Sequence, residues 1–203
     1  MKIINAGYEF ITPIDGVTIL KRIELAGRTC YKSEDKITDD SAIKFAQNII
    51  KRGHEAVLEH CSFTVKFIVD RGVSHEIVRH RMASYCQESS RYCDYSKDKF
   101  GNEITVIKPC FWDDDSELYM DWKSAMRTAE SHYFDLLQHG ATPQEARAVL
   151  PNALKTEIVM TANCVEFDHF FNLRSKGTTG APHPDMKVVA DKAYSIYLQN
   201  TKF

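Results

Sequence analysis

The sequence predicts an α+β fold in a single domain that spans residues 1–203. Stretches with alternating apolar residues, typical of strands, occur beside stretches with apolar residues at helical spacing. The two kinds do not alternate in the steady strand–helix–strand rhythm that indicates a parallel sheet. No repeat or Pro/Gly/Ser-rich linker divides the chain, and its 203 residues, 43% of them hydrophobic, are enough to bury one core.

Four stretches are predicted to be strands from their alternation and their β-branched and aromatic residues. The clearest is the pattern SFTVKFIVD, in which Ser62, Thr64 and Lys66 lie opposite a wholly apolar face. The predicted strands are residues 2–12, 62–70, 103–109 and 154–162.

Helical spacing and capping residues predict the helices. The helix 41–53 is expected to end at Gly53, and Ser74 is the expected N-cap of a short helix. Thr142, Pro143 and Glu145 form the pattern of a capping box. The predicted helices are residues 16–30, 41–53, 75–83, 114–139, 142–150, 165–174 and 185–200, with loops over 84–99 and 175–184.

The composition limits the partners of this chain. A net charge of −2 and an isoelectric point of about 6.4 give no global attraction to nucleic acid or to a membrane surface. The apolar runs are too short to span a bilayer. Six cysteines without a CxxC pair, and no signal segment at the start, predict a reduced, cytoplasmic protein. Any anion must therefore be met by local charge.

That local charge is concentrated in RHRMASYCQESSRY, which begins at Arg79. Arg79 and Arg81 would point roughly 200° apart on a helix, so either the helix ends there or two ligands are served from opposite sides. If the chain then continues extended, Gln87, Ser89 and Arg91 share one side and suit a base with a phosphate. The alternative is a solvated basic helix end followed by a polar loop.

Two further arginines stand in apolar surroundings. Arg147 lies on the otherwise apolar helix ARAVLP, and Arg174 follows FDHFFNL just before a glycine-rich loop. A buried guanidinium needs a partner. Either these arginines bind a ligand, or each forms a salt bridge to a local acid such as Glu145 or Asp168.

Other classes of function have weaker support. A metal-dependent hydrolase would use the histidines at 54, 60, 75 and 80, but neither pair has the four-residue spacing of ligands on one helix face, so no metal site is expected. An RNA-binding module would combine the basic residues with Tyr85 and Tyr92 for stacking. The near-neutral net charge argues against it.

The sequence resembles the flavin-dependent thymidylate synthases. The motif RHR, followed by seven residues and Ser89, matches the signature of that family. Three further blocks occur in family order: GHEAVLEH, then ARAVLPNALKTEIVMTAN, then FFNLRS with APHPDM. The resemblance extends from about residue 28 to the last helix, and four blocks in the same order make chance agreement improbable.

The resemblance implies an activity and its cofactors. The family methylates dUMP to dTMP, with methylenetetrahydrofolate as carbon donor and NADPH-reduced FAD as the source of hydride. Its active sites form where the subunits of a homotetramer meet. This sequence has no GxGxxG motif, so FAD would bind through arginines and histidines instead of a Rossmann loop.

The resemblance also assigns residues. Positions matching FAD contacts are Ala56, Arg79, His80, Arg81, Gln87, Asn163, Val165 and His169. Positions matching nucleotide contacts are Glu76, Arg79, Gln87, Glu88, Ser89, Ser90, Arg91, Arg147 and Arg174. Arg174 would lie against the uracil ring as the catalytic group.

The chain departs from the common family pattern at a few positions. Glu76 stands where the family often has Gln, and Cys86 with Gln87 replaces a frequent Asn-Glu pair. Val165 stands where an arginine often follows the asparagine, so it is left at most a backbone role. His183 matches the closing histidine of the family.

Uracil C5 is a poor nucleophile until electron density builds on it, and Ser89 is the tempting group to add to the ring. A serine needs an adjacent base to become nucleophilic, and the nearby Arg91 is no base. The family is also thought to form no covalent adduct. Ser89 is therefore predicted to bind phosphate, and the fixed charge of Arg174 is predicted to stabilise negative charge on the ring.

Overall fold

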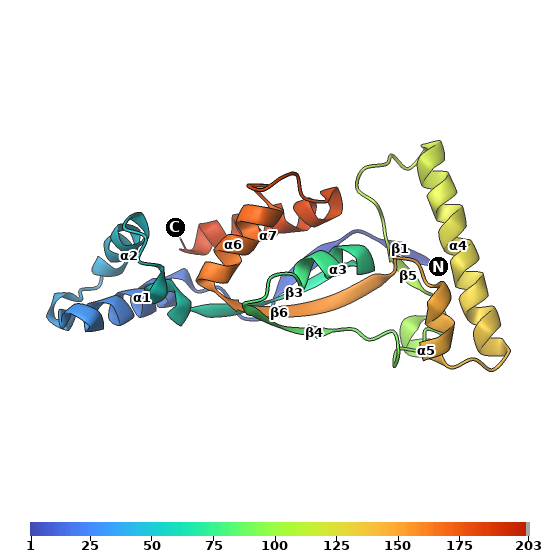
Figure 1. Ribbon diagram of the computed structural model, residues 1–203, viewed down its shortest axis with the longest axis horizontal. Coiled ribbons are helices and arrows are strands. Elements are labelled where there is room, and N and C mark those ends of the chain that lie inside the picture. The colour runs from blue at the N-terminus through green and yellow to red at the C-terminus, as the bar shows by residue number, and fades with distance from the viewer. Residues whose placement is uncertain (202–203) are drawn as a thin grey trace.

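A computed structural model of the protein describes residues 1–201. The molecule is elongated, with a sheet along its middle (Figure 1). Helices α1 and α2 lie at one end, α4 and α5 at the other, and α6 and α7 lie over the sheet. The bounds of the helices are α1 Gly16–Tyr31, α2 Ser41–Lys51, α3 Arg71–Ile77, α4 Glu117–Gln138, α5 Pro143–Ala146, α6 Cys164–Arg174 and α7 Pro184–Thr201.

The strands form two sheets, which confirms the predicted mixture of helices and strands. Four strands pair antiparallel in the order β2-β3-β6-β4, and two short strands, β1 and β5, pair in parallel. The bounds are β1 Lys2–Ile4, β2 Gly7–Phe10, β3 Ser62–Asp70, β4 Ala83–Gln87, β5 Thr105–Ile107 and β6 Lys155–Asn163.

The predicted strand 2–12 is wrong as one element, because its two halves belong to different sheets. Residues Lys2–Ile4 pair with β5, and Gly7–Phe10 pair with β3. Side-chain alternation continues through both halves, so the pattern cannot show that the pairing partner changes between them.

The predicted start of the helix 75–83 is also wrong. The helix α3 begins at Arg71, and its N-cap is Asp70, whose carboxylate accepts a hydrogen bond from the amide of Val73 at 2.6 Å. Ser74, the expected cap, is fully buried inside the helix. Because Asp70 is both the last residue of β3 and the cap of α3, no loop residue marks the boundary in the sequence.

The same helix ends earlier than predicted, at Ile77. The hydroxyl of Tyr85 lies 2.9 Å from the carbonyl oxygen of Ile77 and 2.6 Å from that of His80. The single hydroxyl proton of Tyr85 is thus shared between two carbonyl groups at the end of the helix and in the turn after it. The chain then enters strand β4 at Ala83. This strand replaces the end of the predicted helix 75–83 and the start of the predicted loop 84–99.

The predicted capping box at residues 142–145 is confirmed. The amide of Thr142 donates to the carboxylate of Glu145 at 2.8 Å. The helix that it starts lasts one α-turn and continues as a 3₁₀ turn over Arg147–Val149. No helix among residues 1–201 is long and apolar enough to cross a membrane.

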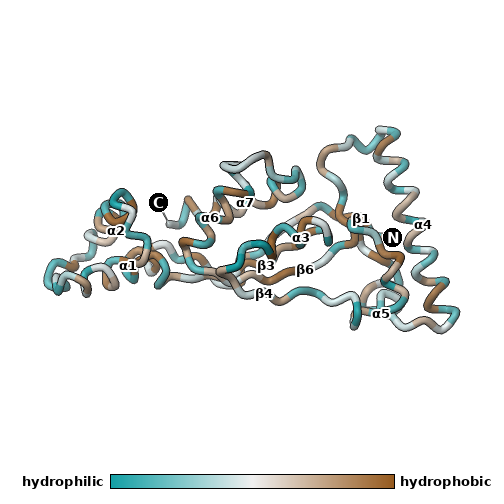
Figure 2. Tube along the Cα trace, viewed as in Figure 1, coloured by the Kyte–Doolittle hydropathy of each residue, from teal (hydrophilic) through white to brown (hydrophobic). Residues whose placement is uncertain are grey.

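Two separate apolar clusters hold these elements together. The larger joins β3 and β6 to α1, α6 and α7, and Phe63 of β3 stacks on Phe167 of α6 with ring centres 3.8 Å apart. The smaller surrounds Tyr133 of α4 and includes Val106 and Leu154. Apolar stretches mark both regions of the chain trace (Figure 2). The larger cluster fixes the elements that frame the site.

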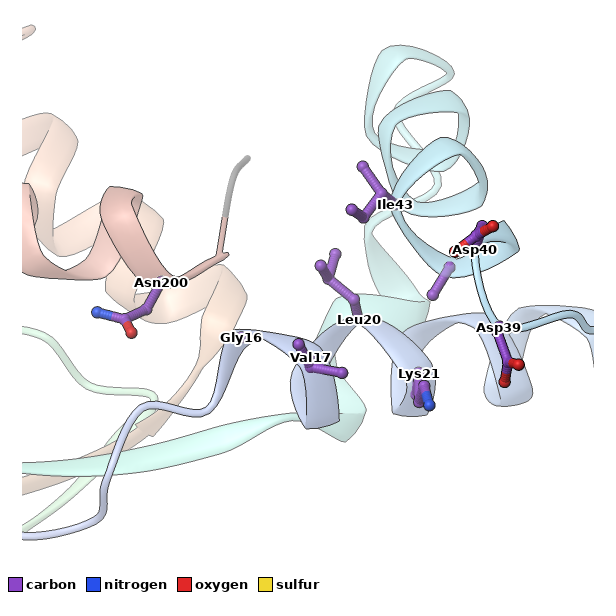
Figure 3. Close-up of a pocket in the computed structure, with 9 residues that line it drawn as sticks. Gly16, Val17, Leu20, Lys21, Asp39, Asp40, Ile43 and Asn200 are labelled. Atoms are coloured by element: carbon purple, nitrogen blue, oxygen red, sulfur yellow. The ribbon is translucent and has the colours of Figure 1, made fainter.

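Helices α1 and α7 meet backbone to backbone at Gly16. A Cβ atom on Gly16 would lie 1.3 Å from the carbonyl oxygen of Asn200, so only glycine fits there. Gly16 and Asn200 both border a small cavity between α1, α2 and α7 (Figure 3).

We expect Gly16→Ala to lower the free energy of unfolding by about 2 kcal/mol, because the methyl group would force α1 and α7 apart. Gly7→Ala is the matched control, since a Cβ at Gly7 meets nothing within 4 Å. Urea denaturation of both variants measures the difference. A Gly16→Ala protein as stable as the Gly7→Ala protein would contradict this contact.

Candidate functional site

The turn between α3 and β4 presents the basic motif. Because α3 ends at Ile77, Arg79 and Arg81 lie outside regular helix. This confirms the alternative in which the helix ends at the basic motif. Both side chains are exposed, and neither forms an ion pair within residues 1–201. They are free to meet an external anion.

A cavity of about 540 Å³ opens beside this turn. This volume falls within the range of roughly 300–1,000 Å³ that is usual for ligand pockets. The charged and titratable residues that line it come from α3, from α6, from the turn after α3 and from the loop before α7. They are Glu76, Arg79, His80, His169, Arg174 and His183.

Arg174, at the end of α6, is held by three hydrogen bonds. Its Nη1 donates to the carboxylate of Glu76 at 2.7 Å, and its Nη2 donates to the Glu76 carbonyl at 3.1 Å. Its Nε donates to Nε2 of His80 at 3.2 Å. The acid that pairs with Arg174 is thus Glu76, not the local Asp168 that the sequence offered as an alternative. The guanidinium is fixed in orientation and leaves one proton free on each Nη atom.

His80 is buried and accepts one of the hydrogen bonds that orient Arg174. Its residue is 2% exposed, and its Nε2 must be unprotonated to accept from Arg174. The pKa of His80 is lowered to about 4, mainly by burial and then by the charges of Arg174 and His169. Its Nδ1 has no hydrogen-bond partner, and the carboxylate of Glu166 lies 3.8 Å from it.

A second basic group lies around the loop after β4. Nη1 of Arg147 lies 3.4 Å from the hydroxyl of the buried Ser90, and Nη2 of Arg91 lies 3.4 Å from the Gln144 side chain. Neither arginine forms an ion pair in the described part of the chain. The alternative of a salt bridge from Arg147 to Glu145 is wrong, because Glu145 serves the capping box.

The side chains just before this loop point into the protein. Gln87 donates to the hydroxyls of Ser74 at 2.9 Å and Thr156 at 3.2 Å. Glu88 pairs with Lys155 at 2.9 Å. Strand β4 ends at Gln87, so the extended arrangement that would set Gln87, Ser89 and Arg91 on one side does not form. The hydroxyl of Ser89 instead accepts a hydrogen bond from the Arg91 amide at 3.3 Å.

The start of α6 borders a further cavity, of about 390 Å³. Asn163 is the N-cap of α6 and accepts from the amide of Glu166 at 2.9 Å. Val165 and His169 line the cavity, and His169 also lines the larger one. Ala56 is exposed on the neighbouring 3₁₀ turn Glu55–His60.

Sequence reasoning missed the acids of this cavity. Glu55, Glu166 and Asp168 all line it, and burial raises the pKa of Asp168 to about 6. The signal for Glu166 was present, because Asn163 and Glu166 have the spacing of a helix cap and its third residue. Nothing local indicated that Glu166 would lie behind His80.

The two basic groups stay apart within one chain. Arg174 belongs to α6 over the middle of the sheet, whereas Arg147 follows α5 at one end of the molecule (Figure 1). The cavity in Figure 3, of about 160 Å³, contains none of the predicted site residues. Among residues 1–201, no three His, Cys, Asp or Glu side chains lie together as metal ligands would.

The chain is similar to several known proteins. The model of the family "Thymidylate synthase complementing protein" matches residues 17–200. A flavin-dependent thymidylate synthase of Pyrococcus furiosus is 36% identical over 163 residues, which cover 80% of this chain and 66% of that protein. One of Geobacter sulfurreducens is 36% identical over 159 residues, covering 75% and 67%. The match thus spans about two thirds of the length of these relatives.

A solved structure shares the fold. The crystal structure of a UMP/dUMP methylase, PolB from Streptomyces cacaoi, bound with 5-Br dUMP, superposes with a TM-score of 0.78 at 18% identity. The match covers 98% of this chain and 93% of that one. Since the family model spans nearly the whole sequence, the chain belongs to the thymidylate synthase complementing protein family, in which its relatives are flavin-dependent thymidylate synthases.

Proposed function

We propose that this protein is a flavin-dependent thymidylate synthase that converts dUMP to dTMP. Methylenetetrahydrofolate would donate the carbon, and FAD reduced by NADPH would supply the hydride. The observation that supports this most is the cavity in which Arg174 is immobilised by Glu76 and His80, beside arginines that have no counterion. The family match and the RHR motif with Ser89 agree with it.

The residues present fit FAD as a ligand. Arg79 and Arg81 are exposed without acid partners, and guanidinium groups suit the paired phosphates of a dinucleotide. The two cavities that share His169 offer adjoining space. When bound, FAD supplies the reducing equivalents. The residues proposed to hold it are Ala56, Arg79, His80, Arg81, Gln87, Asn163, Val165 and His169.

The nucleotide is proposed to bind through both basic groups. Arg79 and Arg174 would meet the base side of dUMP, and Glu76 would contribute to this side by holding Arg174. The remaining proposed contacts are Gln87, Glu88, Ser89, Ser90, Arg91 and Arg147. Of these, Ser89, Ser90 and Arg91 would lie near the phosphate, and Arg147 would reach the same nucleotide from its own helix. Because the two groups lie apart in one chain, we propose that they come together between subunits of a homotetramer with shared active sites.

Residues 1–203 are proposed to act as one flavin-dependent thymidylate synthase-like domain without a nucleic-acid or membrane partner. The six cysteines are free thiols in the described residues, which supports a reducing, cytoplasmic setting.

The proposed chemistry rests on electrostatics. Arg174 has a side chain only 16% exposed, and a fixed charge in a site shielded from water stabilises charge that develops on a ligand. It would stabilise negative charge on the uracil ring, which favours loss of the proton on N3 and raises the electron density at C5. Ser89 has an amide donor rather than a base beside its hydroxyl, which supports its role as a phosphate ligand.

The purified protein is expected to be yellow, because the proposed function requires bound flavin. Denaturation should release FAD, and the intact protein should form dTMP from dUMP, methylenetetrahydrofolate and NADPH. The absorption spectrum and product chromatography measure both. A colourless protein that takes up no added FAD would overturn the proposed function.

Arg174→Ala is expected to slow dTMP formation about a hundredfold, or roughly 3 kcal/mol, because one fixed donor to the developing charge is lost. Flavin reduction by NADPH needs no activated ring and should largely survive. Arg174→Lys should recover little, since an ammonium lacks the planar fork. Comparing NADPH oxidation with dTMP formation separates the steps. An unchanged rate of dTMP formation would show that Arg174 does not stabilise charge on the ring. If Arg174→Ala loses both its bound FAD and flavin reduction by NADPH, the role of Arg174 is structural or flavin-binding.

Stability should depend on pH through His80. Its folded pKa of about 4 lies below the ordinary 6.5, so between these values the unfolded chain binds a proton that the folded one does not. The free energy of unfolding should therefore rise with pH across this window, by up to about 1.4 kcal/mol per pH unit from this group. His80→Gln keeps an acceptor for Arg174 but does not titrate. Urea denaturation from pH 4.5 to 7.5 should show a shallower rise for this variant, and equal slopes would contradict the assignment.

A further inference from the structure

Glu76 is the one carboxylate among the described residues that line the larger cavity. It contacts Arg174 twice, through its side chain and through its backbone carbonyl. The other charged and titratable groups that line this cavity with Arg174 are His80 and Arg79 from the turn, His169 from α6 and His183 from the loop before α7. Among residues 1–201, Glu76 alone brings a negative charge to the lining of this cavity.

The identity of this side chain matters because an amide would make the same hydrogen bond. A glutamine at position 76 has the length of Glu76, and its side-chain oxygen can accept from Nη1 of Arg174. The two residues differ by one full charge. Because position 76 carries the acid in this chain, the guanidinium of Arg174 has a counterion at 2.7 Å.

We propose that Glu76 is a positioning residue that also sets how strongly Arg174 acidifies N3 of a bound pyrimidine nucleotide. This inference rests on the proposed function. The backbone carbonyl of Glu76 and His80 hold the guanidinium in place, and the Glu76 carboxylate offsets its charge. A ring anion beside Arg174 is attracted by the guanidinium and repelled by the carboxylate behind it.

The size of this effect follows from distance and exposure. Charges a few ångströms apart near a protein surface interact by several kcal/mol before screening by water and salt. The Glu76 side chain is 28% exposed, so it is only partly screened. Replacing Glu76 with glutamine should favour the ring anion over the neutral ring about tenfold, which is one unit in the pKa of N3.

The test is a pH titration of 5-fluoro-dUMP bound to the full-length protein. Electron withdrawal by fluorine makes N3–H of this nucleotide more acidic than that of dUMP, and ionisation of the ring changes its ultraviolet spectrum. In Glu76→Gln, the midpoint of ring ionisation in the complex should lie about one pH unit below that of the wild type. The histidines around the cavity are unchanged between the two proteins, so their titration cancels in the comparison.

Two further variants sharpen the result. Glu9→Gln is the matched control, because Glu9 also contacts a cation, Lys66, at 2.7 Å but lies on β2 away from the cavity. It should keep the wild-type midpoint. Glu76→Asp keeps the charge on a shorter side chain and should restore a midpoint close to that of the wild type, even where the hydrogen bond to Arg174 is weakened.

The outcomes separate this inference from the proposed function. Wild-type protein that does not bind the nucleotide would refute the proposed function itself. If the wild type binds but Glu76→Gln shows an unchanged midpoint, Glu76 does not tune Arg174. If folded Glu76→Gln retains FAD but binds no nucleotide, Glu76 is a direct ligand of the base and the inference is wrong. Should Glu76→Gln fail to fold, a clearly lowered midpoint in Glu76→Asp, which keeps the charge, would overturn the inference.

Discussion

The pairing of β3 with β6 is the constraint on which the site depends. The two strands pair over nine positions, from Ser62 opposite Asn163 to Asp70 opposite Lys155. Each strand ends in a residue that caps the next helix, Asp70 for α3 and Asn163 for α6. Because the strands are antiparallel, these caps stand at opposite ends of the ladder. The two helices therefore start at opposite ends of the sheet and approach each other over it.

The lengths of these elements explain where the helices meet. Nine residues of strand cover roughly 27 Å at about 3.4 Å per step. The 7 residues of α3 and the 11 residues of α6 cover about 10 Å and about 16 Å at 1.5 Å per residue. Their C-terminal ends thus come together above the ladder, which places Arg174 against Glu76. The guanidinium also meets a carbonyl at the C-terminal end of α3, where a cation is favoured.

The sequence predicted the paired strands β3 and β6 well, but it did not predict the contact between the C-terminal ends of α3 and α6. Strands β3 and β6 lie within one residue of the predicted ranges, because alternation over nine residues is a strong local signal. The start of α3 was misplaced because Asp70 serves strand and cap at once. The contact between Glu76 and Arg174 joins residues 98 apart in the chain, so no spacing rule reaches it. The resemblance indicated both residues as nucleotide contacts but not that they hold each other.

Four arginines of the candidate site form no ion pair with another described residue. Arg79 and Arg81 lie at the turn after α3, while Arg91 and Arg147 lie near α5 at one end of the molecule. Separation keeps their mutual repulsion low within one chain. In the proposed shared site, groups from different chains would be brought together, and the phosphates of the nucleotide and the flavin would offset the added repulsion. Ligands that bind the assembled form more tightly than the separate chains also favour its assembly. Anion binding and subunit association are then two consequences of the same unpaired arginines.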